Sequence, residues 1–167
     1  MFNYILVAIG ANQPAPGGRP ALETCRWAVD QLSALPHLRL VACSRWYETA
    51  PVPASAQPDY VNGAVRLAGT VEPCALLAIL QMIESRAGRV RSVPNAPRTL
   101  DLDLLGVDQA VVEQPGLVVP HPRLHTRGFV LAPLCDVAPD WIHPVLHRTT
   151  TALLADADLA GIRPFGA

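Results

Sequence analysis

The chain has 167 residues, of which 50% are hydrophobic, and its thirteen basic and fourteen acidic residues leave a net charge of -1. A chain of this length can bury a core of its own, so we expect one domain over residues 1–167. The small net charge excludes a field that would hold the whole molecule on nucleic acid or on an anionic membrane. Any anion site must therefore be local.

The lack of lysine and the lack of a CxxC pair each argue against a class of functional site. All thirteen basic residues are arginine, so the chain lacks the lysine with which a Walker A loop reaches the phosphates of a nucleotide. The four cysteines form no CxxC pair, which argues against a zinc cluster or a redox motif and favours a reducing cytoplasmic location. The apolar start from Met1 to Ala8 is too short for a signal sequence, and no apolar run reaches the ~18 residues needed to span a bilayer.

The predicted elements alternate between strands and helices. Residues 3–9 form a β-branched and aromatic run that predicts a strand, and residues 20–35 carry apolar side chains at helical spacing. Residues 39–47 and 60–67 predict a second and a third strand, with a proline-rich loop between them. A second helix is expected from Pro73 to the glycine at position 88, and residues 99–107 predict a fourth strand.

This β-α-β-β-α-β order predicts an α+β fold of the ferredoxin-like kind, in which two helices pack on one face of an antiparallel sheet. Residues 128–137 and 149–157 have the pattern of short helices, which the four-strand unit does not require. We therefore expect a ferredoxin-like sandwich with additional short C-terminal helices.

The densest chemical signal runs from Gly88 to Asp103, with arginines first and carboxylates second. On the predicted strand Asp101 and Asp103 are two residues apart, so both point to one face while neighbouring leucines point to the core. Two carboxylates about 7 Å apart along a strand can jointly hold Mg²⁺, which prefers oxygen ligands. A bare Asp-x-Asp is also typical of a half-exposed strand with two solvated aspartates.

Arginines dominate the part of this stretch that precedes the carboxylates. Residues 85–100 include Arg86, Arg89, Arg91 and Arg98 and contain no acidic residue. Guanidinium groups form bidentate, permanently charged hydrogen bonds with phosphate oxygens. The stretch therefore predicts an external polyphosphate ligand, with a solvated basic loop as the alternative.

The segment Pro97-Arg98-Thr99-Leu100-Asp101-Leu102-Asp103 resembles the signature of the 6-hydroxymethyl-7,8-dihydropterin pyrophosphokinases. The resemblance extends over nearly the whole chain, because further motifs occur in the family's order at Ala8–Asn12, Gln57–Asn62, Val119–His121 and Arg127–Phe129. It implies an enzyme of folate biosynthesis that transfers pyrophosphate from MgATP to 6-hydroxymethyl-7,8-dihydropterin and releases AMP. It also implies that the partners are these two substrates. The small net charge and the lack of a long apolar run lead us to expect no nucleic acid and no membrane, and we expect a monomer.

The resemblance also implies roles for individual residues. Asp101 and Asp103 would bind two Mg²⁺ ions that bridge the ATP phosphates, and Arg89 and Arg98 would act with them in catalysis. The residues expected to contact ATP are Gln81, Glu84, Arg89, Arg91, Arg98, His121 and Arg127. The residues expected to line the pterin pocket are Thr49, Val52, Tyr60, Asn62 and Phe129. The Asn62 amide would pair with the edge of the pterin ring that carries both donors and acceptors. Without the resemblance, Gln81 and Glu84 are ordinary polar positions of a helix, and both aromatic residues are core residues.

The sequence departs from the family pattern in one loop and leaves other interpretations open. The stretch from Ser92 to Ala96 is shorter than in the family and lacks its Trp-Gly pair, so we expect no tryptophan lid.

The alternative function is a catalytically impaired regulatory module that binds a pterin or a nucleotide. A third interpretation, an acyl phosphatase-like hydrolase, is disfavoured because the sequence has no recognisable anion-binding loop of that kind. Prolines interrupt both spaced histidine pairs, so we expect His125, His143 and His147 to be structural or surface residues.

Overall fold

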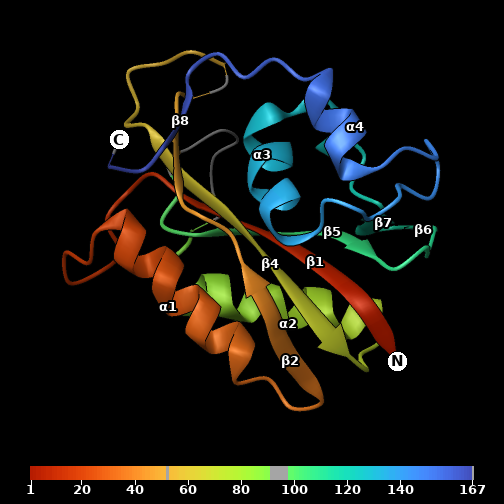
Figure 1. Ribbon diagram of the computed structural model, residues 1–167. Helices are drawn as coiled ribbons and strands as arrows, with labels where there is room; N and C mark the ends of the chain where they lie inside the picture. The colour runs from red at the N-terminus through yellow and green to blue at the C-terminus, as the bar shows by residue number, and fades with distance from the viewer. Residues whose placement is uncertain (52, 91–97, 167) are drawn as a thin grey trace.

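Strand β1 (Phe2–Ala11) is an interior strand of an antiparallel sheet in the computed structural model, which describes residues 1–51, 53–90 and 98–166 (Figure 1). It pairs with β4 (Tyr60–Gly69) on one side and with β5 (Asp101–Val107) on the other. Strands β2 (Leu38–Cys43) and β3 (Tyr47–Thr49) pair with successive parts of β4, and β8 (Ile162–Pro164) pairs with β3. The sheet order is therefore β5-β1-β4-β3-β8, with β2 beside β4.

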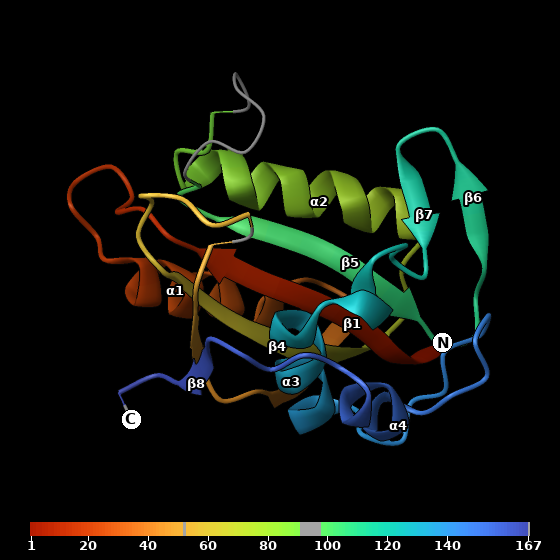
Figure 2. The same cartoon turned by 90° about the horizontal axis from the view of Figure 1, so that it is seen from above.

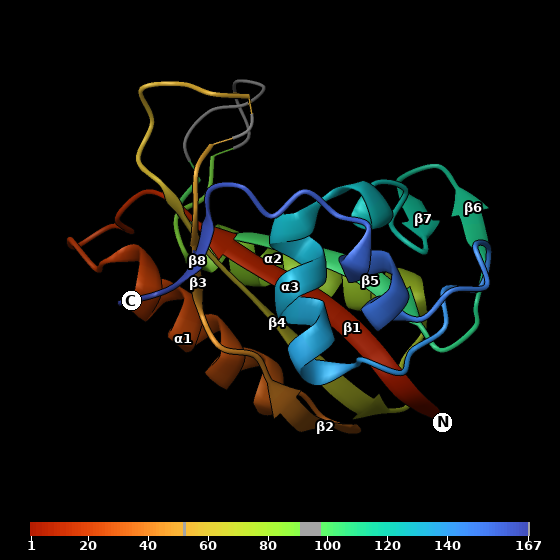
Figure 3. The same cartoon turned by 45° about the horizontal axis from the view of Figure 1, so that its top comes forward.

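The two faces of β1 belong to two different hydrophobic cores. Ile5, Val7 and Ile9 lie in the first core and Leu6 lies in the second, and each of these side chains is buried. Successive side chains of a strand point to opposite faces, so a strand with apolar residues at both parities must be covered on both sides. The sheet is accordingly sandwiched between helices (Figure 3).

Helices α1 (Ala21–Ser33) and α2 (Pro73–Arg86) pack on the first core, with their buried side chains against β1, β4 and β5. The start of α2 follows from local chemistry, because Pro73 occupies the first helical position and Glu72 accepts hydrogen bonds from the backbone N–H groups of Cys74 and Ala75. Helices α3 (Gly128–Val137) and α4 (Thr150–Ala155) form the second core on the opposite face. Figure 3 shows α3 in front of the sheet and α2 behind it.

A β-hairpin and a single helical turn complete the structure between β5 and α3. Strands β6 (Val112–Gln114) and β7 (Leu117–Val119) turn at Gly116, whose φ of 83° suits glycine, and η1 (Leu124–Thr126) is one turn of 3-10 helix. Leu117 and Val119 are buried in the first core, so the hairpin lies beside the start of α2 (Figure 2).

The predicted antiparallel sheet with packed helices is confirmed, with differences at short elements. Residues 39–47 were expected to form one strand but form parts of β2 and β3, because Ser44 interrupts regular pairing. Its hydroxyl accepts a hydrogen bond from the backbone N–H of Ala64 and donates one to the carbonyl oxygen of Arg45. Strands β6, β7 and β8 were not predicted, since three residues are too few to establish an alternation.

Alternation along β5 determines which side chains reach the second face of the sheet. Leu102 and Leu104 point into the first core and Leu105 lies in the second core, and after the register shift between β1 and β5 the last residue of β5 returns to the first core. Asp101 and Asp103 precede the shift and therefore lie on the face opposite Leu102 and Leu104. Among the described residues, no helix is both long enough and apolar enough to cross a membrane.

We expect Leu80→Ala to lower the free energy of unfolding by about 2–5 kcal/mol, because it removes a fully buried side chain of α2 and leaves a cavity in the first core. Chemical denaturation measures the loss. Met82→Ala is the control on the same helix, because Met82 is 50% exposed. Equal losses in the two variants would contradict the placement of α2 on the sheet.

Candidate functional site

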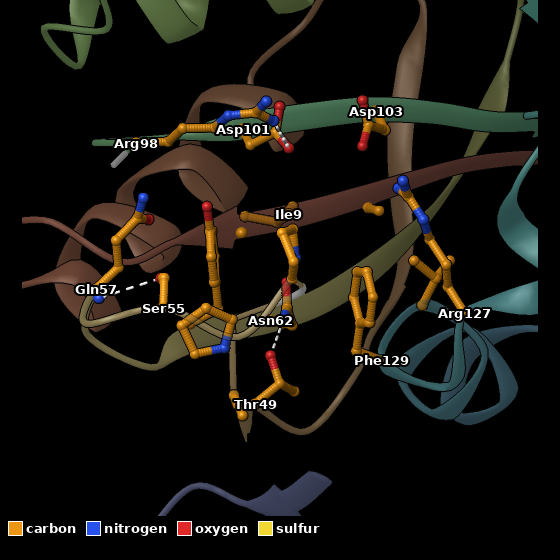
Figure 4. Close-up of a pocket in the computed structure, with 17 residues that line it drawn as sticks. Ile9, Thr49, Ser55, Gln57, Asn62, Arg98, Asp101, Asp103, Arg127 and Phe129 are labelled. Atoms are coloured by element: carbon orange, nitrogen blue, oxygen red, sulfur yellow. Dashed lines mark hydrogen bonds and ion pairs between the residues drawn. The ribbon is translucent and has the colours of Figure 1, made fainter. Parts of the chain in front are cut away.

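A pocket of about 220 Å³ lies where β1, β4 and β5 meet the loop after β3 and the start of α3 (Figure 4). One end of the pocket is charged and the other is formed by a hydroxyl, an amide and two aromatic rings. The charged end contains Arg98, Asp101, Asp103 and Arg127, and the other end contains Thr49, Tyr60, Asn62 and Phe129. All eight belong to the residues singled out in the sequence.

At the charged end, Asp101 lies between two arginines. Arg89 Nη1 donates to Asp101 Oδ1 at 2.8 Å, and Arg98 Nη1 donates to Asp101 Oδ2 at 2.8 Å. The three residues come from the loop after α2, the approach to β5 and β5 itself. Charge-assisted hydrogen bonds of this length fix both guanidinium groups beside the carboxylate.

Glu84 lies behind this group and orients Arg89. Its side chain is 2% exposed, and it accepts hydrogen bonds from Arg89 Nη1 and, at 2.8 Å, from the backbone N–H of Leu102. Arg89 thus links a carboxylate of α2 to a carboxylate of β5. A buried carboxylate requires such partners, because an unpaired charge away from water is costly.

Asp103 is less well neutralised than Asp101. The described residues offer it no hydrogen bond or ion pair, although the side chain of Arg127 points toward it in Figure 4. The pKa of Asp103 is raised from 3.8 to about 7, chiefly by burial and then by the negative charges of Asp101 and Glu84. The positive charges of Arg127 and Arg98 oppose this rise only in part. The site therefore has an excess of negative charge at Asp103 that a cation would relieve.

His121 and Arg127 flank the charged end. Burial, followed by the charge of Arg127, lowers the pKa of His121, and its Nδ1 accepts a hydrogen bond from the backbone N–H of Arg123 at 3.2 Å. A neutral imidazole that accepts at Nδ1 carries its proton on Nε2 and can donate it to an anion. Burial, followed by the charge of Arg123, lowers the pKa of Arg127, whose guanidinium carbon lies 5.6 Å from the centre of the Phe129 ring.

The uncharged end is built around Asn62 on β4. Asn62 Nδ2 donates to Thr49 Oγ1 at 2.6 Å, which orients the amide toward the pocket (Figure 4). Gly10 makes room for this orientation, since a Cβ at this position would lie 2.7 Å from Asn62 Oδ1. Phe129 at the start of α3 and Tyr60 at the start of β4 line the same pocket.

Asn12 connects three segments around the pocket, a role that the sequence did not reveal. It is 3% exposed, and its Nδ2 donates to Gln57 Oε1 at 3.1 Å and to the carbonyl oxygen of Pro58 at 3.3 Å. Its Oδ1 accepts from the backbone N–H of Arg98 at 2.9 Å. Asn12 and Gln57 lie within the family motifs, and that membership was the one available signal.

The remaining predicted residues lie elsewhere. Gln81 is exposed on α2 and does not line the pocket. Val52, Arg91 and the stretch from Ser92 to Ala96 lie outside the described residues. His143 is buried and its Nδ1 accepts hydrogen bonds from the backbone N–H groups of Val145 and Leu146.

Comparisons with known proteins connect this pocket to one family. The family model described as 7,8-dihydro-6-hydroxymethylpterin-pyrophosphokinase (HPPK) matches residues 6–139. A 2-amino-4-hydroxy-6-hydroxymethyldihydropteridine pyrophosphokinase of Pseudomonas aeruginosa is 41% identical over 97% of this chain and 96% of its own length. A protein of the same name from Synechocystis is 37% identical over 87% of this chain and 74% of its own length.

A solved structure supports the fold. The crystal structure of wild-type Plasmodium falciparum HPPK-DHPS matches 93% of this chain with a TM-score of 0.68 at 13% sequence identity. This chain spans 44% of that chain's length.

We expect Asp103→Asn to stabilise the metal-free protein, and to do so more at pH 8 than at pH 5. The raised pKa means that folding favours the protonated carboxyl, so the contribution of Asp103 to stability falls as the pH rises from about 4 through about 7. The neutral amide avoids this loss. The gain in the free energy of unfolding should grow by on the order of 2–3 kcal/mol between pH 5 and pH 8.

Denaturant unfolding in buffer with a chelator, at both pH values, measures this difference. Asp30→Asn is the control, because Asp30 is exposed on α1. A gain that is independent of pH would contradict the charge balance described for Asp103.

Proposed function

Because this chain belongs to the 7,8-dihydro-6-hydroxymethylpterin-pyrophosphokinase family, we propose that it transfers a pyrophosphoryl group from MgATP to 6-hydroxymethyl-7,8-dihydropterin. The products are the pterin pyrophosphate and AMP, and the reaction belongs to folate biosynthesis. The observation that carries this proposal is one pocket with a cluster of arginines and carboxylates at one end and a polar, aromatic lining at the other.

The triphosphate of ATP occupies the charged end in this proposal. Arg89, Arg98 and Arg127 supply permanently charged donors, and His121 supplies a neutral N–H donor. Donors that are already oriented before the ligand arrives stabilise charge that moves between phosphate oxygens during transfer. Glu84 contributes by holding Arg89, while contacts of Gln81 and Arg91 with the nucleotide remain predictions from the family resemblance.

Mg²⁺ fits the carboxylates that the chain provides. The described residues contain no group of three or more His, Cys, Asp or Glu side chains that could hold a metal alone. Mg²⁺ usually takes one or two protein carboxylates and completes its shell with water and phosphate oxygens, so Asp101 and Asp103 are a suitable pair. Asp103, which has no partner among the described residues, has the stronger need for a cation. Two bound Mg²⁺ ions would neutralise the polyphosphate and orient it for attack.

The pterin ring occupies the other end of the pocket. Asn62 presents an amide with a donor and an acceptor, Thr49 holds that amide, and Tyr60 and Phe129 offer flat apolar surfaces. A ring placed there brings its hydroxymethyl group toward Asp101 and Asp103. The contact predicted for Val52 lies outside the described residues.

The reaction in this arrangement is an in-line displacement at the β-phosphorus. The hydroxymethyl oxygen forms a bond to the β-phosphorus and releases its proton to solvent, while the bond from this phosphorus to the oxygen that bridges it to the α-phosphorus breaks and AMP leaves with that oxygen. The chain contributes by binding both substrates in one pocket and by fixing donors around the phosphates, which replaces an encounter in solution by a defined geometry. No side chain is assigned as a general base.

Finer features of the chain are part of the same proposal. The sheet order β5-β1-β4, with β2 and β3 beside β4 and with α1 and α2 on one face, supports a ferredoxin-like unit to which α3 and α4 are additions. We assign residues 1–167 to one domain and the active form to a monomer. The four cysteines are free thiols, in keeping with a reducing cytoplasm.

The test is the identity of the nucleotide product. The purified chain is incubated with MgATP, with and without 6-hydroxymethyl-7,8-dihydropterin, and AMP is separated from ADP. We expect AMP that appears only with the pterin. ADP would contradict pyrophosphoryl transfer, and binding of both substrates without any product would favour the regulatory module.

A second experiment tests the carboxylates. Asp101→Asn and Asp103→Asn should each lower the rate of AMP formation by roughly 100-fold or more, because each removes charge that balances the cations in the site. Circular dichroism should show a retained fold, and Asp30→Asn should keep wild-type activity. Full activity in both site variants would remove them from the proposed metal site.

A further inference from the structure

Strand β8 lies along β3 at the outer wall of the pocket. Thr49, Glu48 and Tyr47 of β3 pair with Ile162, Arg163 and Pro164 of β8. The contact continues on both sides, since the backbone N–H of residue 50 donates to the carbonyl oxygen of residue 161 and that of residue 165 donates to residue 46. The strand that carries Thr49 is therefore supported over its full length by a segment more than 110 residues later in the chain.

The side chain of Arg163 reaches beyond this pairing to a second segment. Its Nη2 lies 2.7 Å from Glu48 Oε2 and 3.1 Å from Asp59 Oδ2. Glu48 immediately precedes Thr49, and Asp59 immediately precedes Tyr60, so the two carboxylates lie at the two ends of the loop between β3 and β4, of which residues 50–51 and 53–58 are described. Arg163 thus links the two ends of this loop from outside the pocket.

The loop held in this way forms part of the pocket wall. Pro51, Pro53, Ser55 and Gln57 line the pocket opposite β5. Asn12 holds the loop from inside through Gln57, whereas Arg163 holds its ends from outside. The first attachment is a hydrogen bond between two amides on the inner side of the loop, and the second consists of two ion pairs on its outer side.

The Arg163 contacts are better suited to positioning the loop than to stabilising the whole fold. The side chains of Arg163, Glu48 and Asp59 are 48%, 28% and 46% exposed, and ion pairs this exposed contribute little to the free energy of unfolding. Removing the arginine, however, leaves two like charges facing each other where the loop begins and ends. Their repulsion acts beside the Thr49–Tyr60 pair, where β3 meets β4, and loosens the loop wall near Asn62.

We propose that Arg163 is a positioning residue for the pterin substrate, because it joins Glu48 and Asp59 and so fixes the described part of this loop beside Asn62 and Tyr60. This inference rests on the proposed function for the identity of the substrate. Arg163 touches neither substrate. Its loss loosens the end of the pocket that holds the ring and leaves the charged end, built from the loop after α2, from β5 and from the start of α3, unchanged.

Arg163→Ala should raise the KM for 6-hydroxymethyl-7,8-dihydropterin about three- to tenfold, with the KM for MgATP and kcat within about twofold of the wild type. Arg148→Ala is the matched control, since Arg148 is an exposed arginine paired with Asp156 at 2.7 Å and does not line the pocket. It should change neither KM. Equal increases in both KM values for Arg163→Ala, or an unchanged pterin KM, would overturn the proposal.

A charge reversal separates the ion pairs from other effects of the substitution. Arg163→Glu should raise the pterin KM further, because three carboxylates then meet at one point. Combining it with Glu48→Arg restores a cation between two carboxylates and should recover most of the affinity. A double variant as weak as Arg163→Glu alone would count against the proposed link.

Hydrogen exchange tests the positioning without any turnover. Peptides from residues 53–59 should exchange faster in Arg163→Ala than in the wild type, while those of β1 and β5 keep their rates and Arg148→Ala changes none of them. A wild-type chain that forms no AMP yet shows this pattern would refute the proposed function and leave the loop attachment standing. An unchanged exchange rate would refute the attachment.

Discussion

The burial of both faces of β1 is the constraint on which the rest of the structure depends. Ile5 and Val7 face one core and Leu6 faces the other, and all three are fully buried. The chain must therefore supply a helical layer on each side, α1 and α2 on one and α3 and α4 on the other. Near Gly10 the second helical layer no longer covers the sheet, and the pocket lies there. On this face the neighbouring β5 carries Asp101 and Asp103 beside the pocket and a leucine farther along the strand.

At the charged end of the pocket, arginines and carboxylates lie in contact with one another. Three arginines close together would repel one another, and Asp101 and Glu84 hold two of them in place through hydrogen bonds. Asp103 lacks such compensation among the described residues, and its pKa rises accordingly. The local arrangement thus places guanidinium donors and carboxylates side by side, as the proposed binding of phosphate oxygens and a cation requires, although the net charge of the whole chain is only -1.

The uncharged end depends on attachments between segments that are distant in sequence. Asn12 joins the end of β1 to the loop before β4 and to Arg98, and Arg163 joins both ends of the same loop. Backbone flexibility in a loop of this kind would otherwise cost binding energy, because the loop would have to be ordered when the substrate binds. Attachments on two sides reduce that cost before the ligand arrives.

The sequence alone determined the features that depend on local periodicity and local chemistry. Alternation placed Asp101 and Asp103 on one face of β5 and the leucines on the other, Pro73 marked the start of α2, and the signature around Arg98 identified the family. Tertiary structure alone decided the division of residues 39–47 between β2 and β3, the addition of β8, and the contacts of Asn12 and Arg163. Such contacts join residues up to 115 positions apart, and a pair so distant leaves no periodic pattern in the sequence, because its geometry exists only once the sheet has formed.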